Sequence, residues 1–232
     1  MNTAIILAAG RGTRMNAGRN KQYLILKNKP ILAHSIGIFQ KCNLIDEIIV
    51  VINQDEEANC RINVIEKYQF NKVKKLVPGG DERQHSVYNG LMHVNSECDI
   101  VLVHDGARPL VTHDVIERCI NELRSCEAVS CGMPIKDTVK IIDENRNVRV
   151  TPMRDSVWIT QTPQAFKLEI LLKAHNHALE EKIICTDDAM LVEQLGINVR
   201  MVEGDYENIK ITTPDDLIMA ESILNYKRKF RK

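Results

Sequence analysis

Short apolar runs recur along the chain between longer stretches of helical periodicity. The runs are rich in β-branched residues and predict strands at 3–9, 47–53, 74–78, 99–105, 128–134, 197–204 and 208–212. Between them, apolar residues return every three or four positions, which predicts helices near 31–41, 55–68, 82–95, 113–126, 167–181, 187–195 and 213–224. Three of the runs are almost continuously apolar, as expected when helices cover both faces of a sheet. The pattern therefore predicts an α/β fold with a doubly wound, mostly parallel sheet.

The stretch 137–163 departs from this alternation. Polar and apolar residues alternate with a period of two on both sides of the polar turn 143–147, which predicts a β-hairpin. We expect residues 137–157 to form a projecting arm. Because an isolated hairpin is only marginally stable in water, the arm is predicted to pack against a second copy of the chain in a homodimer.

Two helix starts carry recognisable capping residues. Thr213 is the expected N-cap of the last helix, and Asp216 completes a capping box. Thr186 is the expected N-cap of the helix that begins near residue 187, which accounts for the acidic pair Asp187 and Asp188 without a metal ion.

Composition narrows the class of protein. The 232 residues, 44% of them hydrophobic, suit a single domain spanning 1–232. Lys and Arg number 31, as do Asp and Glu, and this balance argues against a general nucleic-acid-binding protein. The seven cysteines include no C-x-x-C pair, which favours reduced thiols in a cytoplasmic protein. No apolar run approaches the ~18 residues of a membrane span, and neither a span nor a signal peptide is expected.

The loop after the first predicted strand reads AAGRGTRM and is followed by a lysine. It lacks the Gly-Lys-Ser/Thr of a P-loop, and Met15 replaces the third glycine of the dinucleotide-binding fingerprint. Small residues let backbone N–H groups approach a base or a phosphate, and Arg14 and Lys21 add positive charge. The loop predicts a polyanion site, with a tight turn bearing two surface cations as the alternative.

Two further strand ends carry candidate ligand-binding residues. Gly79 and Gly80 precede a predicted helix whose first N–H groups are unpaired, and Ser86 can bind a base edge. The alternative is an ordinary turn in which Asp81 caps the helix. Asp105 ends a predicted strand at the edge where open α/β sheets bind ligands, and can accept from a ribose hydroxyl or help to bind Mg²⁺.

Two cations lie near these strand ends. Arg108 can fork onto a phosphate. Lys210 is expected to point opposite to Ile209 and Ile211 on its strand, toward the ligand edge, with a solvent-facing lysine as the alternative. A His–Asp phosphohydrolase centre is disfavoured because the other histidines show no metal-binding spacing.

Together these stretches resemble one family across positions 8–217. The motifs AAGRGTRM, KQYL, GGDERxxSVxNGL, VHDxARP, IKDTVK, RxxxWxxQTPQxF, TDDA and NIKITxPDDL occur in that order. The ordered set resembles the 2-C-methyl-D-erythritol 4-phosphate cytidylyltransferases of the non-mevalonate isoprenoid pathway. Leu7 and Gly106 depart from the usual proline and alanine of that family, at positions that do not carry the chemistry.

The resemblance implies a Rossmann-like nucleotidyltransferase fold and a reaction between CTP and a polyol phosphate that releases pyrophosphate. The attacking phosphate monoester has a second pKa of about 6 and needs no general base at neutral pH. Catalysis then consists of positioning and charge neutralisation. The expected cofactor is Mg²⁺, bound mainly through the CTP phosphates.

The resemblance also implies roles for individual residues. The implied catalytic residues, which stabilise the α-phosphate or hold the attacking phosphate, are Arg14, Lys21, Arg154 and Lys210. The implied nucleotide-binding residues are Ala8, Ala9, Gly10, Gly80, Asp81, Ser86 and Asp105, and Asp105 is also the candidate metal ligand. The implied acceptor-binding residues are Arg108, Thr138 and Thr162. Arg154 lies just beyond the predicted hairpin, so a dimer partner is a candidate source of it.

Three alternatives stay open at this point. A ribitol-5-phosphate cytidylyltransferase has the same chemistry with another alcohol, but tends to show AGG in the first loop and threonine in place of Ser86. A nucleotide-binding regulator without catalysis is disfavoured by the full set of cations. A nicotinamide-dependent oxidoreductase is disfavoured by Met15.

Overall fold

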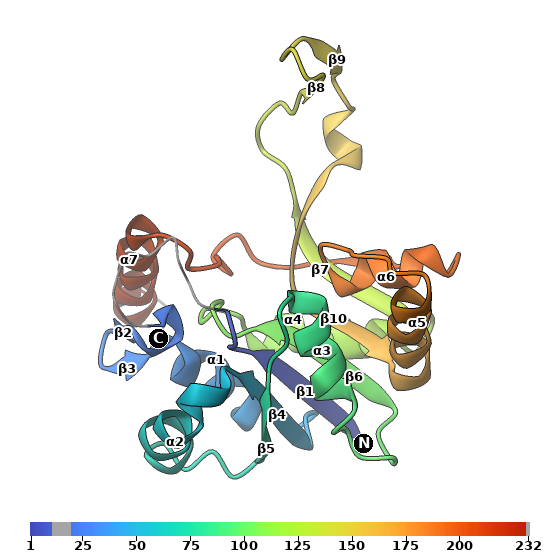
Figure 1. Ribbon diagram of the computed structural model, residues 1–232. Coiled ribbons are helices and arrows are strands. Elements are labelled where there is room, and N and C mark those ends of the chain that lie inside the picture. The colour runs from blue at the N-terminus through green and yellow to red at the C-terminus, as the bar shows by residue number, and fades with distance from the viewer. Residues whose placement is uncertain (11–19, 231–232) are drawn as a thin grey trace.

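The computed structural model describes residues 1–10 and 20–230. Seven strands of the described chain form one sheet in the order β11-β7-β10-β6-β1-β4-β5, with helices on both faces (Figure 1). These strands are β1 Asn2–Leu7, β4 Glu47–Ile52, β5 Val73–Pro78, β6 Ile100–Asp105, β7 Ala128–Pro134, β10 Trp158–Lys167 and β11 Arg200–Glu203. In this sheet β10 runs antiparallel to β6 and β7, and the other neighbours are parallel. The expected doubly wound, mostly parallel sheet is confirmed.

The helices fall close to the segments that the periodicity predicts. The longer ones are α1 Ile31–Lys41, α3 Arg83–Leu91, α4 His113–Glu122, α5 Leu168–Glu180, α6 Asp188–Gln194 and α7 Pro214–Phe230. The segment predicted at 55–68 is an irregular helix, in which the 3-10 turn η3 Gln54–Glu56, the α-helix α2 Glu57–Cys60 and the π-helix η4 Arg61–Glu66 follow one another without a break. Within the described ranges, no helix combines the length and apolar character needed to cross a bilayer.

Alternation along the strands builds a core on each face of the sheet. In β1, Ala4 and Ile6 pack with α1, α4 and the 54–66 segment, whereas Ile5 and Leu7 pack with α3, α5 and α6. Both faces of the strand are therefore buried, which explains why its sequence is continuously apolar. Burying each isoleucine or leucine side chain of this strand stabilises the fold by about 1.5–3 kcal/mol.

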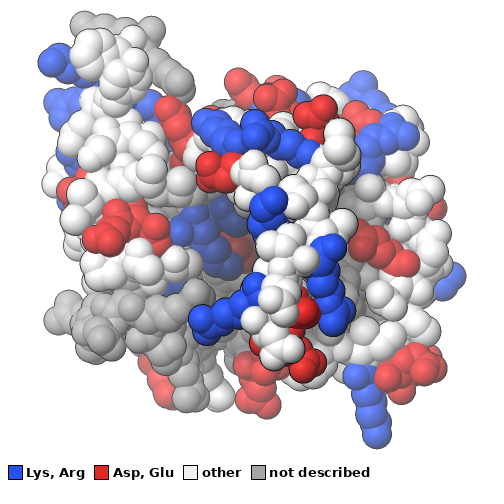
Figure 2. Space-filling model, turned by 90° about the horizontal axis from the view of Figure 1, so that it is seen from above, with Lys and Arg blue, Asp and Glu red and all other residues white. Residues whose placement is uncertain are grey.

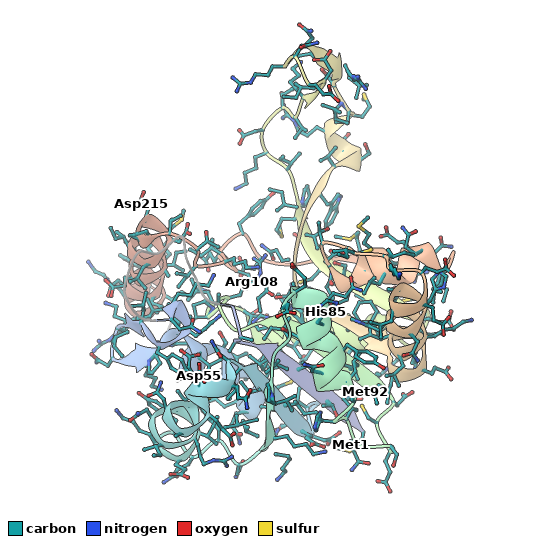
Figure 3. All side chains as sticks on the ribbon, in the orientation of Figure 1. Met1, Asp55, His85, Met92, Arg108 and Asp215 are labelled. Carbon is teal, nitrogen blue, oxygen red and sulfur yellow. The ribbon has the colours of Figure 1, made fainter. Side chains whose placement is uncertain are left out.

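The parallel strands end at one edge of the sheet. Figure 3 shows Arg108, which follows β6, at this edge below the projecting arm, whereas Met1 and Met92 lie at the opposite edge. Loops that follow β1, β4, β5 and β6 thus meet on one side of the molecule, where open α/β sheets place their ligands.

Between β7 and β10 the chain leaves the sheet as the arm (Figure 1). Its tip is a short hairpin of β8 Ile141–Ile142 and β9 Val148–Val150, followed by η5 Arg154–Ser156. The predicted hairpin is wrong at its C-terminal end, because residues 158–163 belong to the main sheet. There Trp158 pairs with Pro134 and Ile159 pairs with Met133 of β7.

The predicted strand at 208–212 is also wrong. Its backbone bonds go to loops and side chains instead of a neighbouring strand, so no ladder forms. The Ile211 N–H donates to the Ala107 carbonyl at 2.8 Å, and the Arg108 guanidinium donates to the Asn208 carbonyl at 2.8 Å. The segment is nevertheless held firmly, since Ile211 and Asn208 are fully buried.

The helix starts test the predicted caps. The capping box of α7 is confirmed, with the Thr213 N–H 2.8 Å from Asp216 Oδ2 and the Asp216 N–H 3.4 Å from Thr213 Oγ1. The prediction of Thr186 as a cap is wrong, because Asp187 caps α6 and accepts from the Met190 N–H at 2.9 Å. Asp81 does not cap α3, which begins after Glu82 without a side-chain cap.

Candidate active site

A pocket of about 670 Å³ lies at the carboxyl edge of the sheet. Seen from above, Lys and Arg side chains gather in a hollow beside the arm, with acidic side chains next to them (Figure 2). The pocket is lined by Leu7, Ala9, Gly10, Lys21, Gln22, Asn53, Gln54, Gly79, Gly80, Asp81, Glu82, Arg83, Ser86, Asp105, Ala107 and Lys210. Eight of the residues expected from the sequence therefore meet in one cavity, although they come from distant parts of the chain.

One wall is a tight glycine turn between β5 and α3. A Cβ on Gly79 would lie 2.3 Å from the Ala9 methyl group, and one on Gly80 would lie 2.5 Å from His85 Cβ. Only glycine allows this approach of the turn to the loop after β1. Ser86 fixes the turn, because its Oγ accepts from the Gly80 N–H at 3.1 Å. This wall suits a flat ligand that is contacted through backbone groups.

Two lysines converge on the opposite side of the pocket. Lys21 lies in η2 (Lys21–Tyr23), which Asn20 caps, and its ammonium donates to the Ile211 carbonyl at 3.2 Å. Ile211 is the neighbour of Lys210, whose ammonium lies 2.8 Å from Asp105 Oδ2. The 208–212 segment therefore brings both cations to the same cavity without being a strand.

Asp105 faces three cations. Besides Lys210, its carboxylate lies 3.5 Å from Arg83 Nε and 3.7 Å from Arg108 Nε. Burial by itself would raise the pKa of Asp105, but the charges of Arg83, Lys210 and Arg108 outweigh burial and hold that pKa well below its usual range. Asp105 is therefore an anion in the free protein and can accept hydrogen bonds from a ligand hydroxyl.

Arg83 is a pocket residue that the sequence reasoning missed. Its Nη1 lies 2.7 Å from Asp188 Oδ2, and it stands in the first turn of α3 directly after the glycine turn. Burial lowers the pKa of Arg83, but the charges of Asp188 and Asp105 raise it by more, so the guanidinium stays charged. One feature of the sequence could have identified Arg83 as a site residue: it stands at a predicted helix start close to Gly79 and Gly80, where ligands commonly bind.

Behind Asp105 lies a buried hydrogen-bonded chain. Thr162 Oγ1 accepts from the Asp105 N–H at 3.0 Å and contacts His104 Nδ1 at 3.1 Å. His104 Nε2 lies 3.1 Å from the Arg108 carbonyl. Burial lowers the pKa of His104 to about 4, so the ring is neutral, carries its proton on Nε2 and accepts from the Thr162 hydroxyl. Thr162 thus supports the loop that carries Asp105 and does not line the pocket.

Several expected site residues lie elsewhere. Ala8 is fully buried, and its N–H donates to the Val51 carbonyl at 2.6 Å. Arg108 binds Asn208 beneath the pocket, as described above. Thr138 and Arg154 lie in the arm, where Arg154 Nη2 is 3.4 Å from Thr138 Oγ1. Arg14 lies outside the described residues.

The acidic, histidine and cysteine side chains of the described residues show whether the chain could hold a metal ion by itself. The described residues contain no group of three or more His, Cys, Asp or Glu side chains that could hold one. Asp105 already shares its carboxylate among three cations. The described side chains alone therefore do not provide a set of ligands for a metal ion.

The fold and this pocket define a class of enzyme. The pocket combines a glycine wall that suits a flat ligand, two converging lysines and a carboxylate at the strand ends of an α/β sheet. These are the parts of a nucleotidyltransferase, an enzyme that joins two phosphate-bearing substrates. The chain belongs to the 2-C-methyl-D-erythritol 4-phosphate cytidylyltransferase (IspD) family, whose model matches residues 2–226.

Relatives and solved structures agree over nearly the whole chain. The 2-C-methyl-D-erythritol 4-phosphate cytidylyltransferase of Caldanaerobacter subterraneus subsp. tengcongensis is 50% identical, with 96% of this chain and 98% of the relative covered. That of Alkaliphilus oremlandii is 48% identical, with 99% and 97% covered. The crystal structure of the 4-diphosphocytidyl-2C-methyl-D-erythritol synthase of Anaerococcus prevotii has a TM-score of 0.88 at 36% identity, with 97% and 96% covered. The Francisella tularensis cytidylyltransferase gives 0.80 at 34% identity, with 95% and 98% covered.

Proposed function

We propose that this chain joins CTP and 2-C-methyl-D-erythritol 4-phosphate to give 4-diphosphocytidyl-2-C-methyl-D-erythritol and pyrophosphate. The observation that carries the proposal is the convergence of Lys21 and Lys210 on a pocket with a glycine wall, in a chain of this family. A regulator without catalysis would have no need for both lysines. The named relatives favour methylerythritol phosphate over ribitol 5-phosphate as the acceptor.

The difficulty of this reaction is that one anion attacks another. An oxygen of the acceptor phosphate forms a bond to the α-phosphorus of CTP, while the bond from that phosphorus to pyrophosphate breaks. Lys21 and, by expectation, Arg14 neutralise charge on the α-phosphate. Lys210 and Arg154 hold the attacking phosphate in line. Because the acceptor phosphate is already ionised, no side chain needs to remove a proton.

The nucleotide is assigned to the glycine side of the pocket. Ala9, Gly80 and Asp81 present backbone groups for the cytosine edge, and Ser86 keeps the Gly80 turn in place. Asp105 is assigned to the ribose hydroxyls, which its anionic carboxylate can accept from. Gly10 and the loop that follows it are assigned to the phosphates.

Mg²⁺ is proposed to arrive with the triphosphate, which supplies most of its ligands. This ion keeps several waters and takes one or two protein carboxylates in nucleotide sites. Asp105 is the candidate carboxylate, and it would have to exchange Lys210 for the metal ion. When bound, Mg²⁺ supplies charge neutralisation on the triphosphate.

We further propose that the chain acts as one nucleotidyltransferase domain, 1–232, and dimerises through the arm at 137–157. The arm exposes apolar side chains that a monomer would leave in water, namely Ile141, Ile142, Val148, Val150 and Met153. It also carries Arg154 and Thr138, which its own pocket does not include. A partner's arm is the proposed source of these two groups. All seven cysteines are free thiols, which supports a cytoplasmic location.

A pyrophosphate-release assay tests the proposal. CTP, ATP, GTP and UTP are each offered with methylerythritol phosphate and with ribitol 5-phosphate. We expect turnover with CTP and methylerythritol phosphate to exceed every other combination. Preference for ribitol 5-phosphate would assign the chain to the ribitol enzyme, and absence of pyrophosphate in all combinations would favour a regulator.

A further inference from the structure

A row of polar and charged side chains leads from α5 to the pocket. His175 Nε2 lies 3.2 Å from Asp188 Oδ1, and Asp188 Oδ2 lies 2.7 Å from Arg83 Nη1. On its other side Arg83 Nε lies 3.5 Å from Asp105 Oδ1. Asp105 Oδ2 then faces Lys210 at 2.8 Å. Four elements, α5, α6, α3 and β6, and the 208–212 segment thus contribute one side chain each.

The contact between His175 and Asp188 costs free energy of folding if its only role is to stabilise the core. His175 and Asp188 are fully buried, and removing charged or polar groups from water costs free energy that a close contact repays only in part. Apolar side chains of similar volume commonly stabilise a core equally well. The core on this face of the sheet is largely apolar and includes Leu171, Ala174 and Leu191 of α5 and α6. The polar pair therefore calls for a role other than packing.

Each carboxylate oxygen in the row has its own partner, and this fixes orientation. Asp188 divides its two oxygens between His175 and Arg83, so its carboxylate cannot rotate freely. Its backbone is held as well, because its N–H donates to Gln164 Oε1 at 3.1 Å. The planar guanidinium of Arg83 is in turn placed between two carboxylates, with its Nε 3.5 Å from Asp105 Oδ1.

The hydrogen bonds of Arg83 are incomplete among the described residues. Arg83 lines the pocket, yet its buried Nη2 has no hydrogen-bond partner among the described residues. Buried donors without partners are rare in folded proteins and call for an explanation. A ligand that enters the pocket and adjusts this wall would supply the missing acceptor.

We propose that His175 and Asp188 are positioning residues that hold Arg83 against Asp105 and thereby fix the carboxylate that receives the nucleotide. The identity of that nucleotide as CTP rests on the proposed function. His175 lies on α5, outside the residues that line the pocket, and reaches Arg83 through Asp188.

A double-mutant cycle in the full-length chain tests the proposal. Asp188→Asn keeps the shape of the side chain and removes the charge that holds Arg83. Arg83→Gln removes the guanidinium through which Asp188 is proposed to act. His175→Gln is a second, milder change, and His177→Gln on the same helix is the matched control. For each protein, kcat/KM for CTP, the Kd of CTP by calorimetry and Tm are measured.

We expect Arg83→Gln to lower kcat/KM by about 100-fold and Asp188→Asn by about tenfold, with the Kd of CTP raised in both. The double variant should stay within about twofold of Arg83→Gln, because Asp188 has nothing left to position. His175→Gln should lower kcat/KM by about threefold to tenfold, and lose this effect in the Arg83→Gln background. His177→Gln should leave kcat/KM unchanged.

Two results would overturn the proposal. One is a lower Tm with kcat/KM within about twofold of the unsubstituted chain, which would make the buried pair structural only. The other is independent multiplication of the two effects in the double variant. If Asp188→Asn does not fold, the cycle with His175→Gln decides in the same way. Turnover of the unsubstituted chain with CTP and the acceptor tests the proposed function separately.

Discussion

The hydroxyl of Thr162 makes a sharply testable contribution to both stability and catalysis. Thr162→Val preserves the shape of the side chain but removes the group that donates to His104 Nδ1 and accepts from the Asp105 N–H. Both partners are buried, and each buried polar group left without a partner costs about 1–3 kcal/mol. We therefore expect Thr162→Val to lower the free energy of unfolding by about 3 kcal/mol, or Tm by roughly 10 °C for a chain of this size.

Thr162→Ser is the matched control, because it keeps the hydroxyl and removes one methyl group worth about 0.8 kcal/mol. Urea unfolding followed by circular dichroism measures the difference between the two variants. The loop that carries Asp105 also loses its anchor in Thr162→Val, so kcat/KM for CTP should fall by about tenfold, and by less in Thr162→Ser. Equal stability of the two variants, within about 0.5 kcal/mol, would refute the reasoning. An effect confined to KM for the polyol phosphate would instead favour direct contact with the acceptor.

Four further predictions follow from the pocket, the core and the arm. Lys21→Ala and Lys210→Ala should each lower kcat by about 10²- to 10³-fold without unfolding, because each removes a placed cation, as pyrophosphate release will measure. Burial lowers the pKa of His104 from 6.5 to about 4, so the unfolded chain takes up this proton first as the pH falls. The stability present above pH 6.5 should therefore decline by about 3 kcal/mol as the pH falls through 4, measured by urea unfolding. Val148→Asp, at an arm position that is 56% exposed, should dissociate the proposed dimer in sedimentation experiments. Gly79→Ala should weaken CTP binding in calorimetry by more than about tenfold, since its Cβ would lie 2.3 Å from another methyl group.

Each of these has a control that separates the stated cause from a general disturbance. Lys173→Ala on the exposed face of α5 should retain full turnover, and near-normal turnover of either pocket lysine variant would contradict its role. A His104→Gln variant with the same loss of stability in acid as the unsubstituted chain would contradict the assignment to His104. Glu144→Ala in the arm should remain a dimer, and a monomer before any substitution would count against the arm. Gly37→Ala, where a Cβ has ordinary contacts at 3.8 Å, should bind CTP normally.

Much of the fold follows from the chain because its strands are buried on both faces. Ile5 and Ile6 point to opposite cores, so the first run had to be apolar throughout, and the same holds for β4 and β6. The candidate site followed from a second regularity, since parallel strands end together. Gly80 and Asp105 could be grouped on that basis, whereas the place of Lys21 in the site followed from the family resemblance.

The residues that were missed or misplaced depend on side-chain contacts between distant segments. Arg83 and Asp188 are separated by 105 positions in the sequence, and no local sequence pattern predicts their contact. Lys210 was placed correctly for a wrong reason, because its segment is fixed by Ala107 and Arg108 and not by strand pairing. Thr162 was expected to face the acceptor, and only the packed arrangement reveals that its hydroxyl is engaged with His104.

The antiparallel direction of β10 determines the side of the sheet on which the arm leaves. β10 is antiparallel to both β6 and β7, so β7 must run the same way as β6 and release the chain on the side where Asp105 ends its strand. In the dimer proposed above, a partner that binds the arm would therefore lie on the same side of the sheet as the pocket, opposite to Met1 and Met92 (Figure 3). If the proposed dimer forms through the arm, subunit contact and substrate binding would use the same side of the sheet, and a compound bound at the base of the arm would obstruct both.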